Sequence, residues 1–67
     1  MKTFGELGTL PKVGDLIIRL FANDESELAI ITNIIGDTYH HTKTGHGRYM
    51  HVSHLRGYYH PLRQEKK

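Results

Sequence analysis

Residues 28–52, LAIITNIIGDTYHHTKTGHGRYMHV, decide the fold of this 67-residue chain. The first part, 28–35, is rich in β-branched side chains and is too short to favour a helix, which predicts a strand. The Gly-Asp pair at 36–37 is typical of a hairpin turn, and the residues after it predict two more strands, at 38–43 and 48–52. The stretch therefore predicts three consecutive antiparallel strands.

The residues on either side of this stretch add two strands and one helical turn. Residues 16–21 would place Leu, Ile and Leu on one side and Ile, Arg and Phe on the other, which predicts a strand, and the polar, acidic segment 22–27 predicts the turn that follows it. A serine and a glycine suited to helix ends predict one helical or 3₁₀ turn at 53–57, followed by a short strand at 58–60. Short strands about eight to twelve residues apart favour an all-β fold, here a small five-stranded antiparallel barrel with that turn before the last strand.

The length limits the chain to one domain with a thin core, because a chain this short buries only about 60% of the surface that it exposes when unfolded. We expect an N-terminal extension at 1–11, the barrel at 12–60 and a polar tail at 61–67. The absence of cysteine excludes disulfides and cysteine-based zinc sites. No stretch approaches the roughly 20 apolar residues that span a bilayer, and the N-terminus lacks the apolar segment of a signal peptide. We therefore expect a cytoplasmic protein without a membrane partner.

Three motifs resemble a known family. The segments VGDLIIRL at 13–20, AIITNIIGD at 29–37 and HVSHL at 51–55 resemble small phage-encoded and bacterial SH3-like barrel proteins. The resemblance implies a non-enzymatic binding module, a phage accessory protein that docks on a host or viral protein complex in the host cytoplasm, or else a minor structural protein of the virion. The opening motif is also similar to that of KOW-type barrels in ribosomal and transcription-elongation proteins, which implies nucleic-acid binding as an alternative.

Most of the histidines lie in the predicted hairpin, and strand alternation sorts them by face. A two-residue turn at Thr44 and Gly45 would pair His40 with Tyr49, whereas a four-residue loop, Thr44 to Gly47, would pair His40 with His51. Both registers place these three residues on the outward face, and a three-residue loop would change that assignment. His41 falls on the other side, where we expect it to line the core or its rim.

A metal site is a weak prediction. Directly opposed His40 and His51 would have Cβ atoms about 4.5 to 5.5 Å apart, with His54 as the nearest third ligand. A structural zinc site needs four ligands, and no acidic residue is suitably placed, so we expect neither a metal nor another cofactor. Catalysis is not expected either, because Ser53 and His54 are adjacent and their side chains diverge, so they do not form a nucleophile and its base.

The charge is divided between two halves of the chain. Residues 1–37 contain three basic and six acidic side chains, whereas residues 38–67 contain six basic and one acidic side chain. Tyrosine and arginine concentrate binding energy at protein interfaces, so we expect the C-terminal half to contact a partner protein. The predicted contact face consists of His40, Arg48, Tyr49, His51, Arg56 and Tyr58. The same surface is suited to stacking single-stranded nucleic acid, and a steep fall of affinity with salt would identify that alternative.

Overall fold

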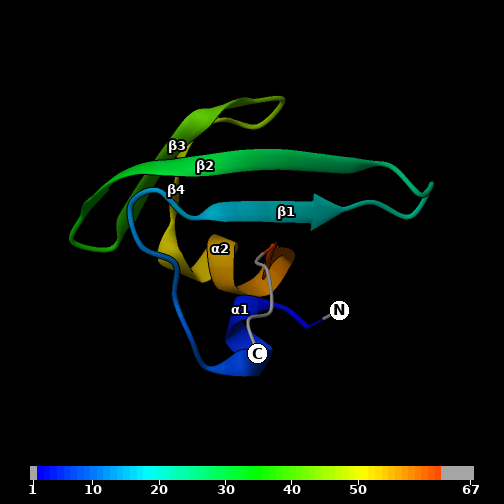
Figure 1. Cartoon of the computed structure of the whole chain (residues 1–67), viewed down its shortest axis with the longest axis horizontal. Helices are drawn as coiled ribbons and strands as arrows, with labels where there is room; N and C mark the ends of the chain where they lie inside the picture. Colours follow the sequence, from blue (N-terminus) through cyan, green and yellow to red (C-terminus); the bar gives the residue numbers. More distant parts are fainter. Residues whose placement is uncertain (1, 63–67) are drawn as a thin grey trace.

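The computed structural model describes residues 2–62, which form one antiparallel sheet with two short helices packed against one of its faces (Figure 1). The helices lie together below the strands in this view. In chain order the elements are α1 (Phe4–Leu7), β1 (Leu16–Leu20), β2 (Ser26–Ile35), β3 (Thr38–Thr44), β4 (Gly47–His51), α2 (Val52–Tyr58) and β5 (Tyr59–Pro61).

The strands form a single sheet in the order β4-β3-β2-β1-β5, and every neighbouring pair is antiparallel. The predicted five-stranded antiparallel framework and the single helix before the last strand are confirmed. The sheet is not closed into the predicted barrel, because β4 and β5 are its two edges and do not pair with each other within residues 2–62. α2 follows β4 without a break and leads directly into the three-residue β5, which pairs with β1 at the opposite edge.

The core lies between the inner face of the sheet and α2. Ile17 on β1, Ile31 on β2, Leu55 on α2 and Tyr59 on β5 each expose 1% or less of their surface. These elements are distant in sequence, so their burial depends on the complete topology. Burying one such aliphatic side chain stabilises the fold by about 1.5 to 3 kcal/mol.

The N-terminal segment, expected as an extension, contains α1 and contributes to the core. Thr3 and Glu6 form a capping box, in which the Thr3 hydroxyl accepts from the Glu6 amide and the Glu6 carboxylate accepts from the Thr3 amide. Phe4 is only 3% exposed and belongs to the hydrophobic core. At Gly5 a Cβ atom would lie 3.0 Å from the Arg56 carbonyl oxygen, so the small residue lets α1 approach α2 closely. At the other end of the chain, residues 63–67 of the expected tail lie outside the described residues.

The β3–β4 hairpin has a two-residue turn, but it consists of Gly45 and His46, one residue beyond the predicted Thr44 and Gly45, because Thr44 pairs with Gly47. His40 is opposite Tyr49, and His51 is opposite Thr38. The alternative register with a four-residue loop, in which His40 would face His51, is therefore not formed. Gly47 follows the turn with φ of 105°, a conformation that only glycine adopts at low cost.

The predicted division of faces in this hairpin is confirmed. Tyr39, His41 and Met50 are buried on the inner side, and Tyr49 is exposed on the outer side. The register slips between His40 and Thr44, so β3 is bulged where it enters the turn.

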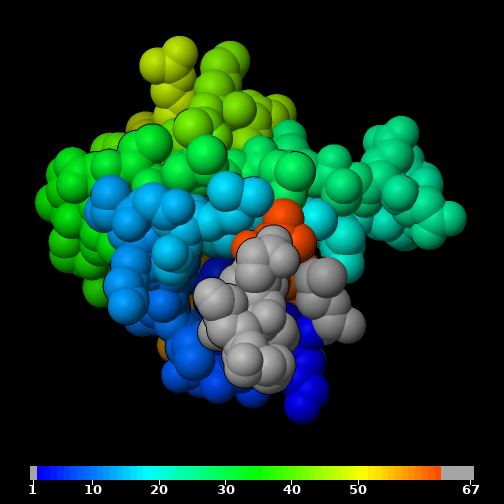
Figure 2. Space-filling view, viewed as in Figure 1, coloured from blue at the N-terminus to red at the C-terminus, as the bar shows by residue number. Residues whose placement is uncertain are grey.

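The β1–β2 hairpin projects from the rest of the molecule, and its tip stands apart in the space-filling view (Figure 2). The tip is closed by a 2.9 Å hydrogen bond from the Phe21 amide to the Glu25 carbonyl oxygen. Asp24 adopts φ of 68° there, a left-handed conformation that aspartate tolerates better than most residues. The acidic turn predicted at 22–27 is thus shorter than expected, because Ser26 and Glu27 already belong to β2.

Candidate functional site

The six residues of the predicted contact face fall into two groups. The strand group lies on β3 and β4 and the helix group on α2: His40, Arg48, Tyr49 and His51 in the first, Arg56 and Tyr58 in the second. All of them are exposed except His40, which is half-buried. Among residues 2–62, no hydrogen bond, ion pair or ring contact joins a member of one group to a member of the other.

The strand group is organised around Tyr49. The ring of Tyr49 lies against the His40 ring, with 5.6 Å between centroids and a tilt of 43°. The pairing follows from the hairpin register, which places the two residues directly opposite each other. Tyr49 nevertheless remains 66% exposed, so most of its surface is open to a partner.

His51 has a structural role at the junction between β4 and α2. It is the N-cap residue of α2, and its Nδ1 accepts a 3.0 Å hydrogen bond from the Ser53 amide. The same nitrogen lies 2.9 Å from the Ser53 hydroxyl oxygen. This contact fixes the imidazole beside the helix terminus and satisfies one of its free amide groups.

The helix group contacts a residue that the sequence analysis did not select, Arg19 on β1. The Arg19 guanidinium lies over the Tyr58 ring at 4.8 Å and over the Phe21 ring at 5.1 Å from the centroids. These two contacts connect the end of β1 to α2. Cation–π contacts of this kind stabilise by about 0.5 to 1 kcal/mol at exposed sites.

Two histidines extend this group of rings. His46, from the β3–β4 turn, stacks with Phe21 at 5.9 Å and 21°, and His54, from α2, lies 4.7 Å from the Tyr58 ring. Burial of the His54 ring, together with the positive charges of Arg19 and His46, lowers the pKa of His54 below its ordinary value. We call the five residues the Arg19 cluster: Arg19, Phe21, His46, His54 and Tyr58.

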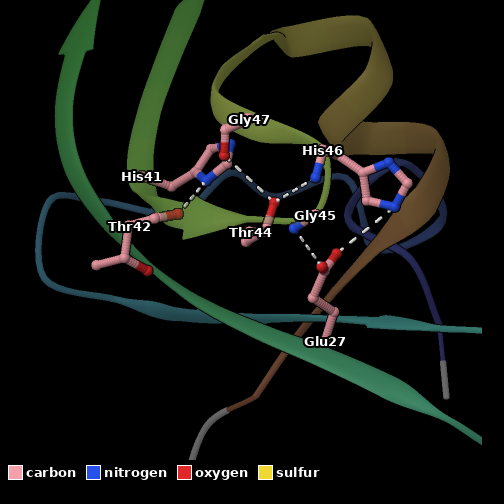
Figure 3. A network of polar contacts seen from close by, with 7 residues as sticks. All are labelled: Glu27, His41, Thr42, Thr44, Gly45, His46 and Gly47. Carbon is pink, nitrogen blue, oxygen red and sulfur yellow. Dashed lines mark hydrogen bonds and ion pairs between the residues drawn. The ribbon is translucent and has the colours of Figure 1, made fainter.

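Glu27 joins β2 to the β3–β4 turn (Figure 3). Its Oε2 accepts a 2.7 Å hydrogen bond from the Gly45 amide, and its Oε1 lies 3.6 Å from His46 Nε2. The register places Glu27 opposite Arg19, yet no ion pair joins them in the part of the chain that the structure describes. The Glu27 carboxylate therefore binds the β3–β4 turn, whereas the Arg19 guanidinium lies against the Phe21 and Tyr58 rings.

The turn itself is held by Thr44. Its hydroxyl accepts a 3.0 Å hydrogen bond from the His46 amide and donates to the Gly47 carbonyl oxygen at 3.3 Å (Figure 3). Tyr59 is fully buried and lies on the same face of the sheet as Glu27, since both pair with Arg19. Burial, with the nearby Glu27 carboxylate, raises the pKa of its hydroxyl. These contacts give the region a fixed shape.

His41 is a core residue, 3% exposed, on the inner side of β3. Its Nδ1 donates a 2.7 Å hydrogen bond to the Thr42 carbonyl oxygen, as Figure 3 shows. Its other ring nitrogen, Nε2, is buried without a hydrogen-bond partner among the described residues, so His41 is packed in the core and not open to a partner.

The histidines predicted as weak metal candidates do not come together as a ligand set. His40 faces Tyr49, His51 caps α2, and His54 lies against Tyr58. Within residues 2–62 no three histidine, cysteine, aspartate or glutamate side chains are grouped to hold a metal ion.

The residues missed by the sequence analysis are Arg19, Phe21, Glu27 and His46. Alternation in β1 puts Arg19 on the same side as Ile17, so a charged residue on an inward position was the available signal. Its ring contacts are with Phe21, two residues further along, and with Tyr58 on α2, which no local pattern connects to β1.

Comparisons with protein-family models, with curated proteins and with solved structures found no match to this chain. Neither helix of the described residues is long and apolar enough to cross a membrane.

Proposed function

We propose that this protein is a non-enzymatic binding module that docks on a partner protein through two separate surfaces, one around Tyr49 on the outer side of the sheet and one around Tyr58 on the helix side, each with the basic residues beside it. One observation carries the proposal. Both tyrosines are more than half exposed, at 66% and 54%, although neighbouring side chains already hold their rings. An ordered aromatic side chain loses little conformational entropy on binding, and tyrosine is among the residues that concentrate binding energy.

The same proposal includes a relationship to SH3-like barrel proteins and, within that group, to phage accessory proteins acting on a host or viral complex. It is supported by the chain order of four strands, one helix and a fifth strand, and by the pairing of β5 with β1. Fold by itself does not determine function, so the assignment to a partner protein depends on the surface tyrosines.

The test is quantitative affinity capture from lysate of the native cell with immobilised protein, comparing Tyr49→Ala and Tyr58→Ala with the wild type. Loss of an interface tyrosine of this kind costs about 2 kcal/mol, which weakens binding roughly 30-fold. Leu7→Ala is the matched control, since Leu7 is 46% exposed on α1 and outside both groups.

A partner retained by the wild type and the control, but lost with either tyrosine variant, supports the proposal. A partner that both tyrosine variants retain at wild-type level, while circular dichroism shows an unchanged fold, contradicts it.

Nucleic-acid binding is an alternative outcome of the same experiments. Fluorescence polarisation with a labelled single-stranded oligonucleotide at 50 and 200 mM salt would show a fall of affinity of several-fold or more if phosphates are the main contact. Binding that is strong and salt-dependent in this way would replace the protein-docking proposal.

A further inference from the structure

β4 is an edge strand, with β3 on one side and no strand on the other in the described part of the chain. A 2.8 Å hydrogen bond from the Val52 amide to the Asp37 carbonyl oxygen determines which backbone groups of this segment face β3. The direction alternates from residue to residue in an antiparallel pair. The backbone groups of Met50 therefore face β3, and those of Tyr49 and His51 point away from it.

Three backbone groups on the open side have no partner in the fold. They are the N–H and C=O of Tyr49 and the N–H of His51, and we call them the free edge of β4. The C=O of His51 does not belong to it, because an N-cap carbonyl accepts the first hydrogen bond of its helix. Among residues 2–62, no turn, cap or side-chain hydrogen bond involves the free edge.

Of the two edges of the sheet, β4 is the one suited to accept another strand. Its side chains leave the edge accessible, since Tyr49 is 66% exposed and Arg48 and His51 are exposed as well. The opposite edge is β5, which has only three residues and ends in Pro61. Short length and proline are features that prevent further pairing at an edge, because proline has no amide hydrogen.

We propose that the free edge of β4 binds an extended, acidic segment of the partner protein, which joins the sheet as an additional strand. The inference rests on the proposed function, because it names how the surface around Tyr49 holds its partner. Backbone hydrogen bonds provide the affinity of such strand addition, and the side chains beside the edge provide its specificity. Tyr49 exchanges two backbone hydrogen bonds with the added strand, and its ring contacts the side chain opposite.

The charges beside the edge favour an acidic segment. β3 and β4 carry the cations Lys43 and Arg48 and no acidic side chain. The acids nearest to them lie beyond the ends of β4: Asp37 is in the turn before β3, and Glu27 accepts from the Gly45 amide in the β3–β4 turn. An acidic segment therefore meets complementary charge along the strand, which favours its association.

The same charges disfavour a second copy of this chain as the added strand. Antiparallel pairing of two β4 strands through Tyr49 makes the two Arg48 side chains diagonal neighbours on one face of the joined sheet. Like charges in that position repel, and charged side chains on edge strands commonly prevent self-association in this way. The occupant is therefore a segment of a different protein.

Amide hydrogen exchange with a defined probe tests the inference. In the free protein the Tyr49 and His51 amides should exchange quickly, whereas the Met50 amide, bonded to β3, should be protected. A capped synthetic peptide of three Val-Glu repeats at millimolar concentration should slow exchange at Tyr49 and His51. The matched controls are three Val-Lys repeats, with the opposite charge, and three Pro-Glu repeats, in which every second residue lacks an amide hydrogen.

Three results of this experiment would overturn the inference. The first is an acidic peptide that leaves both amides unchanged, and the second is equal protection by the lysine or the proline peptide. The third is protection of the Tyr49 amide that appears without peptide and increases with protein concentration, since it would identify a second copy of the chain as the occupant.

A backbone variant separates this inference from the proposed function. The 67-residue chain is short enough for chemical synthesis with a methyl group on the Tyr49 backbone nitrogen, which removes the donor and keeps the side chain. This protein should bind the captured partner roughly tenfold more weakly than the wild type. Its urea denaturation should be unchanged, because the Tyr49 amide does not bond to β3.

Comparison with Tyr49→Ala then distinguishes the two failures. If Tyr49→Ala loses the partner and the N-methylated protein retains it at wild-type affinity, the docking surface stands and the added strand is refuted. If both proteins retain the partner at wild-type affinity, docking around Tyr49 is itself refuted, and the added strand with it.

Discussion

Phe4→Ala tests whether the N-terminal helix is an integral part of the domain. Phe4 exposes only 3% of its surface and packs in the core with residues of the sheet and α2, although it lies in the segment expected as an extension. Replacing a buried phenylalanine with alanine typically costs 3 to 5 kcal/mol, from lost burial and from the cavity that remains. We expect about 3 kcal/mol, at the lower end, because α1 lies at the periphery and can undock locally.

This loss is large relative to the stability of the chain. At about 0.05 to 0.15 kcal/mol per residue, a 67-residue domain has a free energy of unfolding of roughly 3 to 10 kcal/mol. Phe4→Ala should therefore remove between a third and all of it. Urea denaturation followed by circular dichroism measures the change, and Leu7→Ala on the same helix, where the side chain is 46% exposed, should change the free energy by less than about 0.5 kcal/mol. Equal effects of the two substitutions would refute the integral role of α1.

Three further predictions concern the caps and turns and the histidine of α2. Thr3→Ala removes the capping box of α1 and should destabilise the protein by about 1 kcal/mol in the same urea assay, while Thr3→Ser should retain most of the stability. Gly47→Ala forces a Cβ onto a residue with φ of 105° and should cost about 1 to 3 kcal/mol, whereas Gly57→Ala, which has open space around it and no positive φ, is the control. Because the pKa of His54 is lowered in the folded protein, the unfolded chain binds more protons near pH 6, so the His54 contribution should be complete above about pH 6.5 and decrease as the pH falls below it. His54→Gln should flatten this part of a thermal-stability profile between pH 5 and 7.5, and an unchanged slope would show that His54 is not responsible.

The strands could be predicted because local patterns determine them. The β-branched run at 28–35, the Gly-Asp turn at 36–37 and the alternation around His40 and Tyr49 indicate strands, turn and faces without knowledge of distant residues. Local patterns did not decide the register of the β3–β4 hairpin, because two loop lengths fitted the residues between the strands. The two-residue turn forms with Thr44 bonding the turn backbone and Glu27, eighteen residues away from Gly45, accepting its amide.

The contact face could be predicted only in part. Tyr49 and His40 share a strand pair, so alternation placed them together on the outer side. Tyr58 belongs to a helix on the other side of the sheet, and its neighbours there are Arg19 from β1 and His54 from the same helix. The C-terminal half of the chain therefore supplies two separate surface groups. Its charge and composition could not show this, because they do not indicate where each residue lies on the folded surface.

By itself, the sequence determined the strand content, the hairpin faces and the division of charge, since these depend on backbone sterics and on residues within a few positions of one another. The tertiary structure decided that the sheet stays open, that Phe4 completes the core, and that Arg19 pairs with rings and not with Glu27. Each of these depends on which distant segments pack together, and hydrophobic burial, which drives that packing, is non-directional and leaves no local signal in the chain.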